Sequence, residues 1–267
     1  MSGVRNRYSR VIREPWLRMV LRQPFVAAGG SPSIYLSGDF SASAMGRLAK
    51  NAFDEVLKQD RSLPSAVYDM EGMSGQKYRS FINKFVRWLP DARYLEIGSC
   101  AGSTAVAALY GNKAKALCID NWSEYGGPKA EFFANIESIR SSQLDFSFVE
   151  QDFRAVDYGS IGTFNVYLFD GPHSERDQYD ALVLPQRALA ETYLLVVDDW
   201  NWFRVRVGTL HALKHTGSKI ECSIEIRTSL DESHPEIWGR NSDWHNGYFI
   251  AVIKRGSRSA KMPARQE

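Results

Sequence analysis

The sequence predicts an α/β protein built on a doubly wound, mostly parallel sheet, and three observations lead to this fold class. From Asp91 onward, apolar segments of strand length alternate with segments of helical periodicity, which is typical of a parallel sheet covered on both faces. A turn with two glycines, Gly98 and Gly102, joins the first of these strands to an alanine-rich helix. Five successive strands end in acidic residues, at the edge where open α/β sheets bind ligands.

The individual elements follow from periodicity and chain breakers. Two helices are expected first, over residues 44–57 and 78–88, with the breaker Gly29-Gly30-Ser31-Pro32 before the first and Pro90 after the second. The strand at 93–97 and the helix at 103–110 follow. Four further strands are expected at 116–120, 146–150, 164–169 and 193–197, with a helix containing Phe132, Phe133, Ile136 and Ile139 before the second of them. Two last strands, at 223–228 and 248–254, bring the total to seven.

The composition is that of a globular protein with one principal domain. The chain has 267 residues, a hydrophobic content of 44% and a formal net charge of +2, so it can bury a sizeable core and is not a polyanionic or strongly basic protein. We expect a basic N-terminal arm and helical cap over residues 1–71, the principal domain over 72–256 and a disordered polar tail over 257–267.

The N-terminal arm is locally basic, because Glu14 is the single acid beside Arg5, Arg7, Arg10, Arg13, Arg18 and Arg22. It could contact nucleic acid, an anionic membrane or a polyanionic substrate, although a solvated arm or an interface helix is the simpler interpretation. No apolar run has the length of a membrane span, so we expect a cytoplasmic protein. The three cysteines have no paired or metal-type spacing and are expected to be reduced.

The turn after the first strand, residues 94–104, favours a cationic ligand over a pyrophosphate. Cys100 and Ser103 stand where the dinucleotide fingerprint requires its second and third glycines. Glu96 at the strand end would repel a phosphate and attract a cation with a free amino group, which describes the sulfonium S-adenosylmethionine. The alternative is an ordinary strand-to-helix turn, which any doubly wound fold contains.

The acids at the strand ends predict further parts of a site. Asp120 lies where a carboxylate can accept hydrogen bonds from a ribose diol, with Asn121 and Trp122 directly after it, and Asp152 would lie near an adenine. Adjacent strands should bring Asp170, Asp198 and Asp199 together, and three such carboxylates need a cation, for which Mg²⁺ is suitable. His173 could act as general base. Taken singly, each acid could instead be a helix cap or loop residue, and His173 an exposed turn histidine.

The segments 94–104, Phe169-Asp-Gly-Pro-His173 and Val197-Asp-Asp199 resemble those of the class I S-adenosylmethionine-dependent methyltransferases. More narrowly, they are similar to the metal-dependent O-methyltransferases of the macrocin and mycinamicin sugar type and of the catechol and caffeoyl-CoA type. The resemblance covers residues 72–254, making 72–256 the methyltransferase domain. It implies a Rossmann-like, mostly parallel seven-stranded sheet that is finished by a C-terminal antiparallel hairpin and carries an N-terminal helical cap.

The resemblance also implies roles for particular residues. Glu96, Gly98 and Ser99 would line the methionine end of the cofactor, with Ser103 or Thr104 near its carboxylate and Met73 and Ser74 closing the pocket. Asp120 would hold the ribose and Asp152 would lie by the adenine. The metal ligands would be Asp170, Asp198 and Asp199, with Asp170 also beside the cofactor. The catechol type has lysine and asparagine where this chain has His173 and Asp199, which favours a sugar-like hydroxyl.

The expected function is therefore a divalent-metal-dependent O-methyltransferase that uses S-adenosylmethionine on a sugar-like or vicinal-diol small molecule or a glycoconjugate. A catechol or phenolic acceptor is one alternative, and a nucleic-acid methyltransferase, an NAD(P)-dependent oxidoreductase or a non-catalytic cofactor-binding protein are others. Partners would be a small-molecule or glycan hydroxyl acceptor; nucleic acid is not expected, and homo-oligomers stay open. Aromatic residues after Asp199 could wall the acceptor site or belong to the core, namely Trp200, Trp202, Phe203, Trp238 and Trp244.

Overall fold

The computed structural model describes residues 32–58 and 61–256. The arginines of the basic arm, Arg5 to Arg22, and the tail at 257–267 lie outside the described residues. Within them, no helix combines the length and the apolar character needed to cross a membrane.

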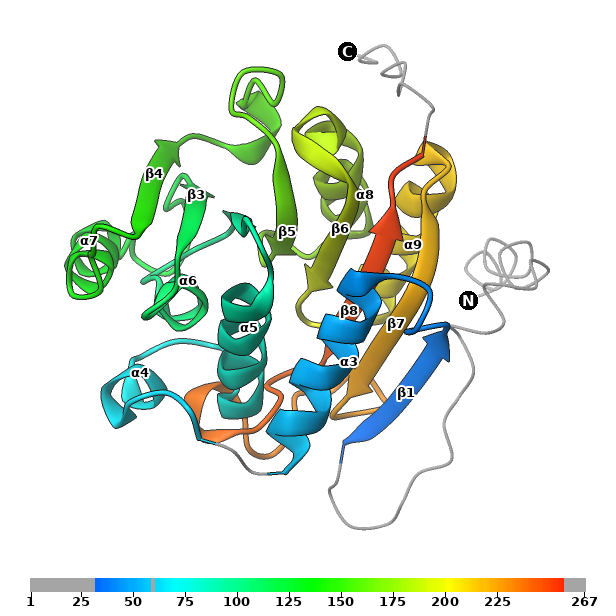
Figure 1. Cartoon of the computed structure of the whole chain (residues 1–267), viewed down its shortest axis with the longest axis horizontal. Coiled ribbons are helices and arrows are strands. Elements are labelled where there is room, and N and C mark those ends of the chain that lie inside the picture. The colour runs from blue at the N-terminus through cyan, green and yellow to red at the C-terminus, as the bar shows by residue number, and fades with distance from the viewer. Residues whose placement is uncertain (1–31, 59–60, 257–267) are drawn as a thin grey trace, which may run out of the picture.

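One eight-stranded sheet forms the centre of the molecule (Figure 1). Its order is β1-β7-β8-β6-β5-β2-β3-β4, with bounds β1 Ser33–Gly38, β2 Arg93–Ile97, β3 Ala114–Asp120, β4 Leu144–Glu150, β5 Phe164–Phe169, β6 Leu189–Val197, β7 Lys219–Arg227 and β8 Tyr248–Lys254. Strands β2 to β6 pair in parallel, whereas β8 pairs antiparallel with both β6 and β7. The doubly wound α/β fold and its C-terminal antiparallel hairpin are therefore confirmed.

The sheet has one strand more than the seven predicted. Strand β1 pairs antiparallel with β7, in a register from Ser33 opposite Arg227 to Gly38 opposite Cys222. The segment is six residues long and only partly buried, so its own sequence carries little periodicity. It becomes a strand because the outer edge of β7 offers unpaired backbone groups, and that edge is created by the fold.

Helices cover both faces of the sheet. On one face lie α3 (Ala44–Leu57), α5 (Gln76–Trp88) and α6 (Ser103–Leu109), and on the other α8 (Glu175–Val183) and α9 (Phe203–Thr216) (Figure 1). The shorter elements are α4 (Ser65–Asp69), α7 (Lys129–Glu137) and three 3-10 helices, Phe153–Ala155, Leu184–Ala188 and Gly239–Asn241. Both faces of the parallel strands are consequently apolar, and two large hydrophobic clusters flank the sheet.

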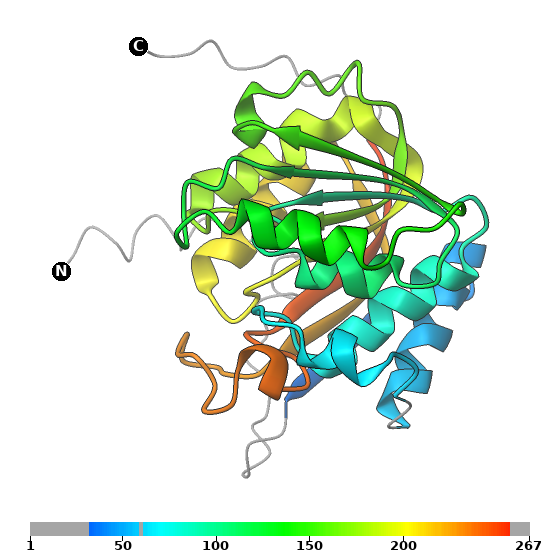
Figure 2. The same ribbon diagram turned by 90° about the vertical axis from the view of Figure 1, so that its left-hand side faces the viewer.

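The N-terminal helix α3 packs into the same core as the sheet. It buries Ala49, Ala52, Phe53 and Val56 beside α5. Phe53 also contacts Trp244, with ring centroids 5.7 Å apart, and Trp244 is buried, as expected for a core residue. The C-terminal loop before β8 is thereby held against α3 and α5. Figure 2 shows this loop, drawn in orange, on the side of the molecule towards which the parallel strands point.

Candidate active site

A cavity of about 530 Å³ opens at the carboxyl ends of the parallel strands. This volume falls in the range of small-molecule sites. The cavity is lined by nine of the predicted residues, namely Met73, Gly98, Asp120, Asn121, Trp122, Asp152, Asp170, His173 and Asp199. The predicted convergence of strand ends on one rim is thus confirmed for four of the six acids.

Gly98 brings two loops of the rim into close contact. Its φ is +88°, and a Cβ at this position would lie 2.0 Å from the carbonyl oxygen of Asp170. No other amino acid fits without moving the loop after β5. Gly102 also has a positive φ, and it faces the ring of Phe132 in α7 rather than the preceding strand. The two glycines therefore set the position of Asp170 and the packing of α7 on the turn.

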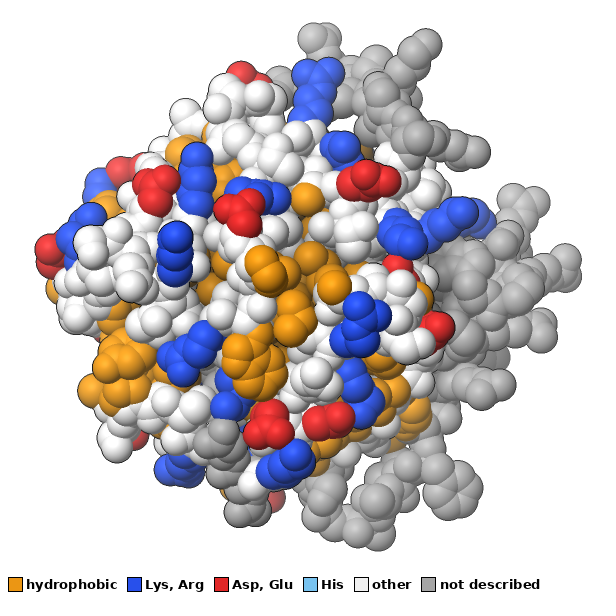
Figure 3. Space-filling model, viewed as in Figure 1, with side chains coloured by type: hydrophobic (Ala, Val, Ile, Leu, Met, Phe, Trp, Pro, Cys, Tyr) orange, Lys and Arg blue, Asp and Glu red, His pale blue; other side chains and the backbone are white. Residues whose placement is uncertain are grey.

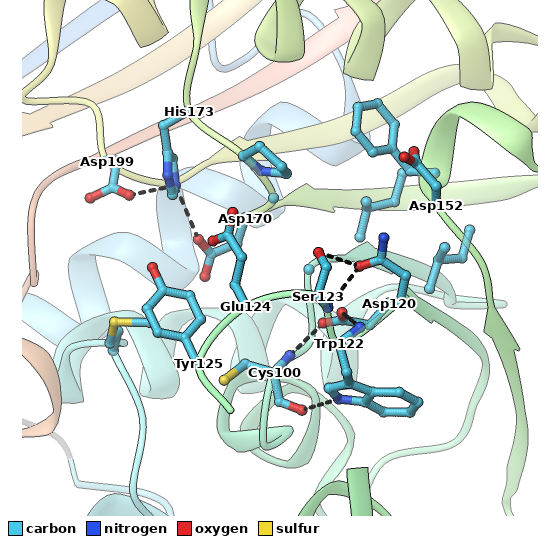
Figure 4. Close-up of a pocket in the computed structure, with 18 of the residues that line it drawn as sticks. Cys100, Asp120, Trp122, Ser123, Glu124, Tyr125, Asp152, Asp170, His173 and Asp199 are labelled. Atoms are coloured by element: carbon cyan, nitrogen blue, oxygen red, sulfur yellow. Dashed lines mark hydrogen bonds and ion pairs between the residues drawn. The ribbon is translucent and has the colours of Figure 1, made fainter. Parts of the chain in front are cut away.

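Asp120 is held rigidly at the end of β3. Its Oδ2 accepts a hydrogen bond from the backbone N–H of Cys100 at 2.8 Å, and its Oδ1 accepts one from Trp122 at 2.7 Å (Figure 4). Each carboxylate oxygen keeps a further lone pair that a ligand hydroxyl can use. The Trp122 indole donates to the Cys100 carbonyl at 3.0 Å and stacks on Phe148. Asp120 and Trp122 thus form a fixed polar and aromatic corner of the cavity.

Asp152 lines the same end of the cavity from the loop after β4. Its side chain accepts from the backbone N–H of Arg154 at 2.8 Å and thereby caps the 3-10 helix Phe153–Ala155. Asn121 accepts hydrogen bonds from Ser123, which closes the loop after β3. Both residues line the same cavity as Asp120, and their contacts with a cofactor stay a prediction.

Six predicted site residues are buried beneath the cavity instead of lining it, namely Ser74, Glu96, Ser99, Ser103, Thr104 and Asp198. Glu96 points into the core and accepts a hydrogen bond from the Tyr94 hydroxyl. Burial raises the pKa of Glu96 to about 8, although the Tyr94 hydrogen bond opposes this shift. Glu96 Oε1 and Ser99 Oγ have no hydrogen-bond partner. Direct cofactor contacts of these six residues stay a prediction.

At the other end of the cavity, His173 lies between two carboxylates (Figure 4). Its Nε2 is 2.6 Å from Asp199 Oδ2 and 3.7 Å from Asp170 Oδ1. Burial alone would lower the pKa of His173, but hydrogen bonds and charge from Asp170 and Asp199 raise it to about 10. Burial raises the pKa of Asp170 to about 6, against the effect of His173. Burial also acts to raise the pKa of Asp199, yet its contact with His173 lowers it overall.

The carboxylates group differently from the predicted trio. Asp170, His173 and Asp199 form one cluster with ligand atoms within 4.8 Å of one another, and Asp198, Asp199 and His245 form a second. His173 therefore takes the place beside Asp170 and Asp199 that was predicted for Asp198. Asp198 is buried, and its Oδ1 accepts the backbone N–H of Asp199 at 2.7 Å. Burial, followed by the charge of Asp170, raises its pKa well above the usual range.

His245 and Asn246 are site residues that sequence reasoning missed. His245 lines the cavity; its Nδ1 accepts the Gly239 N–H at 3.0 Å, and burial lowers its pKa to about 4. A neutral imidazole whose Nδ1 accepts must carry its proton on Nε2, the atom 3.9 Å from Asp199 Oδ1. Asn246 donates to Asp199 Oδ1 at 2.5 Å and accepts from Asn201 at 2.8 Å. The only sequence signal was the polar His-Asn-Gly run directly before the last strand.

The backbone around the cavity is strained. Among the described residues, seven non-glycine positions have positive φ, and five of them line the cavity, namely Cys100, Trp122, Tyr125, Asp199 and His245. Such conformations cost about 1–3 kcal/mol each and persist where the surrounding structure enforces them. Their concentration here indicates that side-chain placement at this site has been favoured over local stability.

Aromatic rings wall the cavity beside His173. Trp202 contacts His173 and His234 with centroid distances of 5.1 and 5.3 Å, and Trp238 contacts His234 and His245, both at 6.2 Å. Trp200 instead stacks on Phe249 inside the core, and Phe203 begins α9. The loop between β7 and β8 therefore reaches the cavity through His234 and Trp238.

No protein-family model matches the chain, and no curated protein matches it at a significant level. Solved structures that resemble it are distant in sequence. TrmN from Thermus thermophilus is 13% identical over 66% of this chain and 48% of that chain, with a TM-score of 0.45. A precorrin-6y C5,15-methyltransferase from Geobacter metallireducens is 14% identical over 67% of this chain and 89% of that chain, with a TM-score of 0.46. An SAH-bound methyltransferase from Podospora anserina is 11% identical over 78% of this chain and 87% of that chain, also with a TM-score of 0.46.

This chain spans about half the length of the TrmN chain. The similarity to these structures is therefore a similarity of fold alone.

Proposed function

We propose that this protein is an S-adenosylmethionine-dependent O-methyltransferase that uses a divalent cation. The observation that carries the proposal is the cavity itself. One end has the fixed corner of Asp120, Trp122 and Asp152, and the other has the cluster of Asp170, His173 and Asp199. A cofactor and an acceptor hydroxyl would meet between these two ends.

The residues present fit the cofactor. Asp120 offers two pre-oriented carboxylate oxygens for a ribose diol, and Trp122 and Asp152 border the space for the base. The unpartnered Glu96 Oε1 beneath the turn suits a ligand ammonium, whose positive charge would favour the ionised carboxylate over the neutral acid that a pKa of about 8 gives. When bound, S-adenosylmethionine supplies a methyl group on a sulfonium. The chain's contribution is to orient it, because close positioning of reactants lowers the barrier substantially.

The residues also fit a divalent cation, which Asp170, His173 and Asp199 would hold. Two carboxylates and one imidazole are a common donor set, and the imidazole extends the choice beyond Mg²⁺ to ions such as Mn²⁺ or Fe²⁺. The second cluster fits less well, because His245 Nε2 carries a proton and has no lone pair to offer. When bound, a cation supplies positive charge that favours the deprotonated form of an acceptor hydroxyl.

His173 is better suited to the ligand set than to the role of general base predicted from the sequence. With a pKa of about 10 it is an imidazolium at neutral pH and cannot accept a proton in this state. As a ligand it would give up that proton on cation binding. Asn246 and the ring of Trp202 would then hold Asp199 and His173 in place.

The charge of the cavity argues against phosphate-bearing ligands. Its described lining contains the acids Asp120, Glu124, Asp152, Asp170 and Asp199 and neither lysine nor arginine. On the face seen in Figure 3, basic side chains are scattered among acidic ones and form no single patch. A nucleic-acid backbone requires basic contacts, and a dinucleotide pyrophosphate would be repelled. A neutral hydroxyl acceptor such as a sugar agrees with the lining, and a catechol is the second candidate because Trp202 and Trp238 could also stack on a phenol ring.

The test combines cofactor binding with methyl transfer. We expect S-adenosylhomocysteine to bind in calorimetry, and labelled methyl to pass to vicinal diols or sugars with Mg²⁺ or Mn²⁺ but not with EDTA. Transfer that is undiminished in EDTA would refute the cation, whereas transfer to catechols alone would select the second acceptor. Binding of NADH instead of S-adenosylhomocysteine would refute the methyltransferase proposal.

A further inference from the structure

The guanidinium of Arg79 is buried on α5 and holds the loop that precedes this helix. The side chain is fully buried. Its Nε donates to Ser74 Oγ at 2.9 Å, and its Nη1 donates to the carbonyls of Val67, Tyr68 and Met70 at 2.8 to 3.1 Å. These four bonds occupy Nε and Nη1 and leave Nη2 as the remaining nitrogen of the guanidinium.

The third nitrogen of the Arg79 guanidinium, Nη2, has no partner among the described residues. Nη2 is buried without a hydrogen bond, and across the described residues no acidic side chain lies within ion-pair distance of Arg79. Burial lowers the pKa of Arg79 to about 10, so the group stays charged at neutral pH. An uncompensated buried charge is costly, and buried charges in proteins are normally paired. The missing partner is therefore an anion.

Gly72 shows where that anion would lie. A side chain here would meet Ser103 Oγ at 2.0 Å and would come within 3.4 Å of Arg79 Nη2. Nη2 of Arg79 thus lies near Gly72 and the start of α6, directly after the turn whose Gly98 and Cys100 line the cavity. Met73, next to Gly72, lines the same cavity. Arg79 therefore lies behind the loop of Gly72, Met73 and Ser74, of which Met73 borders the cavity.

We propose that Arg79 binds a carboxylate, namely that of the amino-acid part of S-adenosylmethionine. This inference rests on the proposed function. The unpartnered atoms around the turn are an acid, Glu96 Oε1, and a guanidinium, Arg79 Nη2, and together they complement the ammonium and carboxylate of an amino acid. Because Arg79 does not line the cavity, the pairing requires a local shift of the loop at residues 70–74.

The experiment compares two probes by calorimetry on the full chain. S-Adenosylhomocysteine has the amino-acid carboxylate, whereas 5′-methylthioadenosine lacks it. Arg79→Met should weaken S-adenosylhomocysteine roughly 10- to 100-fold, as expected for loss of a charge-assisted hydrogen bond, and should change methylthioadenosine by less than about twofold. The control is Arg87→Met, on the same helix, where the lost guanidinium donates to Asn112 Oδ1; both affinities should stay unchanged.

Equal weakening of both probes by Arg79→Met would overturn the inference, since it would show that Arg79 acts only by holding the loop. If Arg79→Met does not fold, Arg79→Lys takes its place, because it keeps the charge but loses the fork of donors. It should then weaken S-adenosylhomocysteine selectively, and an unchanged ratio of the two affinities would overturn the inference. A wild-type chain that binds neither probe would refute the proposed function itself.

Discussion

The cation site yields the sharpest prediction, which is that Asp170→Asn abolishes cation binding while His245→Gln preserves it. Asp170 belongs to the cluster whose imidazole, His173, becomes a neutral ligand by losing one proton, whereas the imidazole of His245 is already neutral and carries its single proton on the inward nitrogen. A carboxylate oxygen lies about 2.3 Å from such a cation. Removing one charge at that distance costs roughly 3.5 kcal/mol even at the dielectric constant of water, which corresponds to a several-hundredfold loss of affinity.

The loss should be at least this large, because Asp170 is mostly shielded from solvent and screening is weaker there. Calorimetric titration with Mn²⁺ measures it, supported by the rise in melting temperature that a bound ion produces. His245→Gln should change the affinity by less than about threefold. The reasoning is refuted if His245→Gln loses the ion and Asp170→Asn retains it, because the second cluster would then be the site.

The other predictions concern the turn, the buried acid and the aromatic wall. Gly98→Ala should lower the free energy of unfolding by more than about 2 kcal/mol in denaturant titrations, because the cost of a positive φ is added to the cost of the 2.0 Å clash with Asp170. The control Gly126→Ala has a similar φ but open space around it, and it should cost only about 1 kcal/mol. Glu96 has a pKa of about 8 in the folded protein and an ordinary value of 4.5, so the free energy of unfolding should fall as the pH rises between these two values. Glu96→Gln should remove this pH dependence in melting curves recorded across the range. A pH dependence that persists in the variant would contradict the role of Glu96. Trp238→Ala should raise the KM for the acceptor and leave the affinity for S-adenosylhomocysteine unchanged, whereas Trp238→Phe should keep the KM near the wild-type value. An unchanged KM in Trp238→Ala would show that this ring does not contact the acceptor.

Local pattern was sufficient for most of the architecture. The alternation of apolar strands with helices predicted the parallel strands and α3, whose bounds at residues 44–57 agree with the structure. It also predicted that the six acids at the strand ends share one rim, because parallel strands in one sheet end at the same edge, and four of them line the cavity, namely Asp120, Asp152, Asp170 and Asp199. These features depend on periodicity and on chain direction, and both can be recognised from short stretches of consecutive residues.

The pairing of groups within the site required the tertiary structure. Strand β1 exists because β7 has a free edge, and Glu96 lies under the turn because its side chain points into the core. The sequence alone could not show that His173 lies between Asp170 and Asp199, or that His245 and Asn246 reach Asp199 from a loop more than forty residues away. Such contacts form between segments remote in the chain, and their distances are determined by how the loops close over the sheet, which no local pattern records.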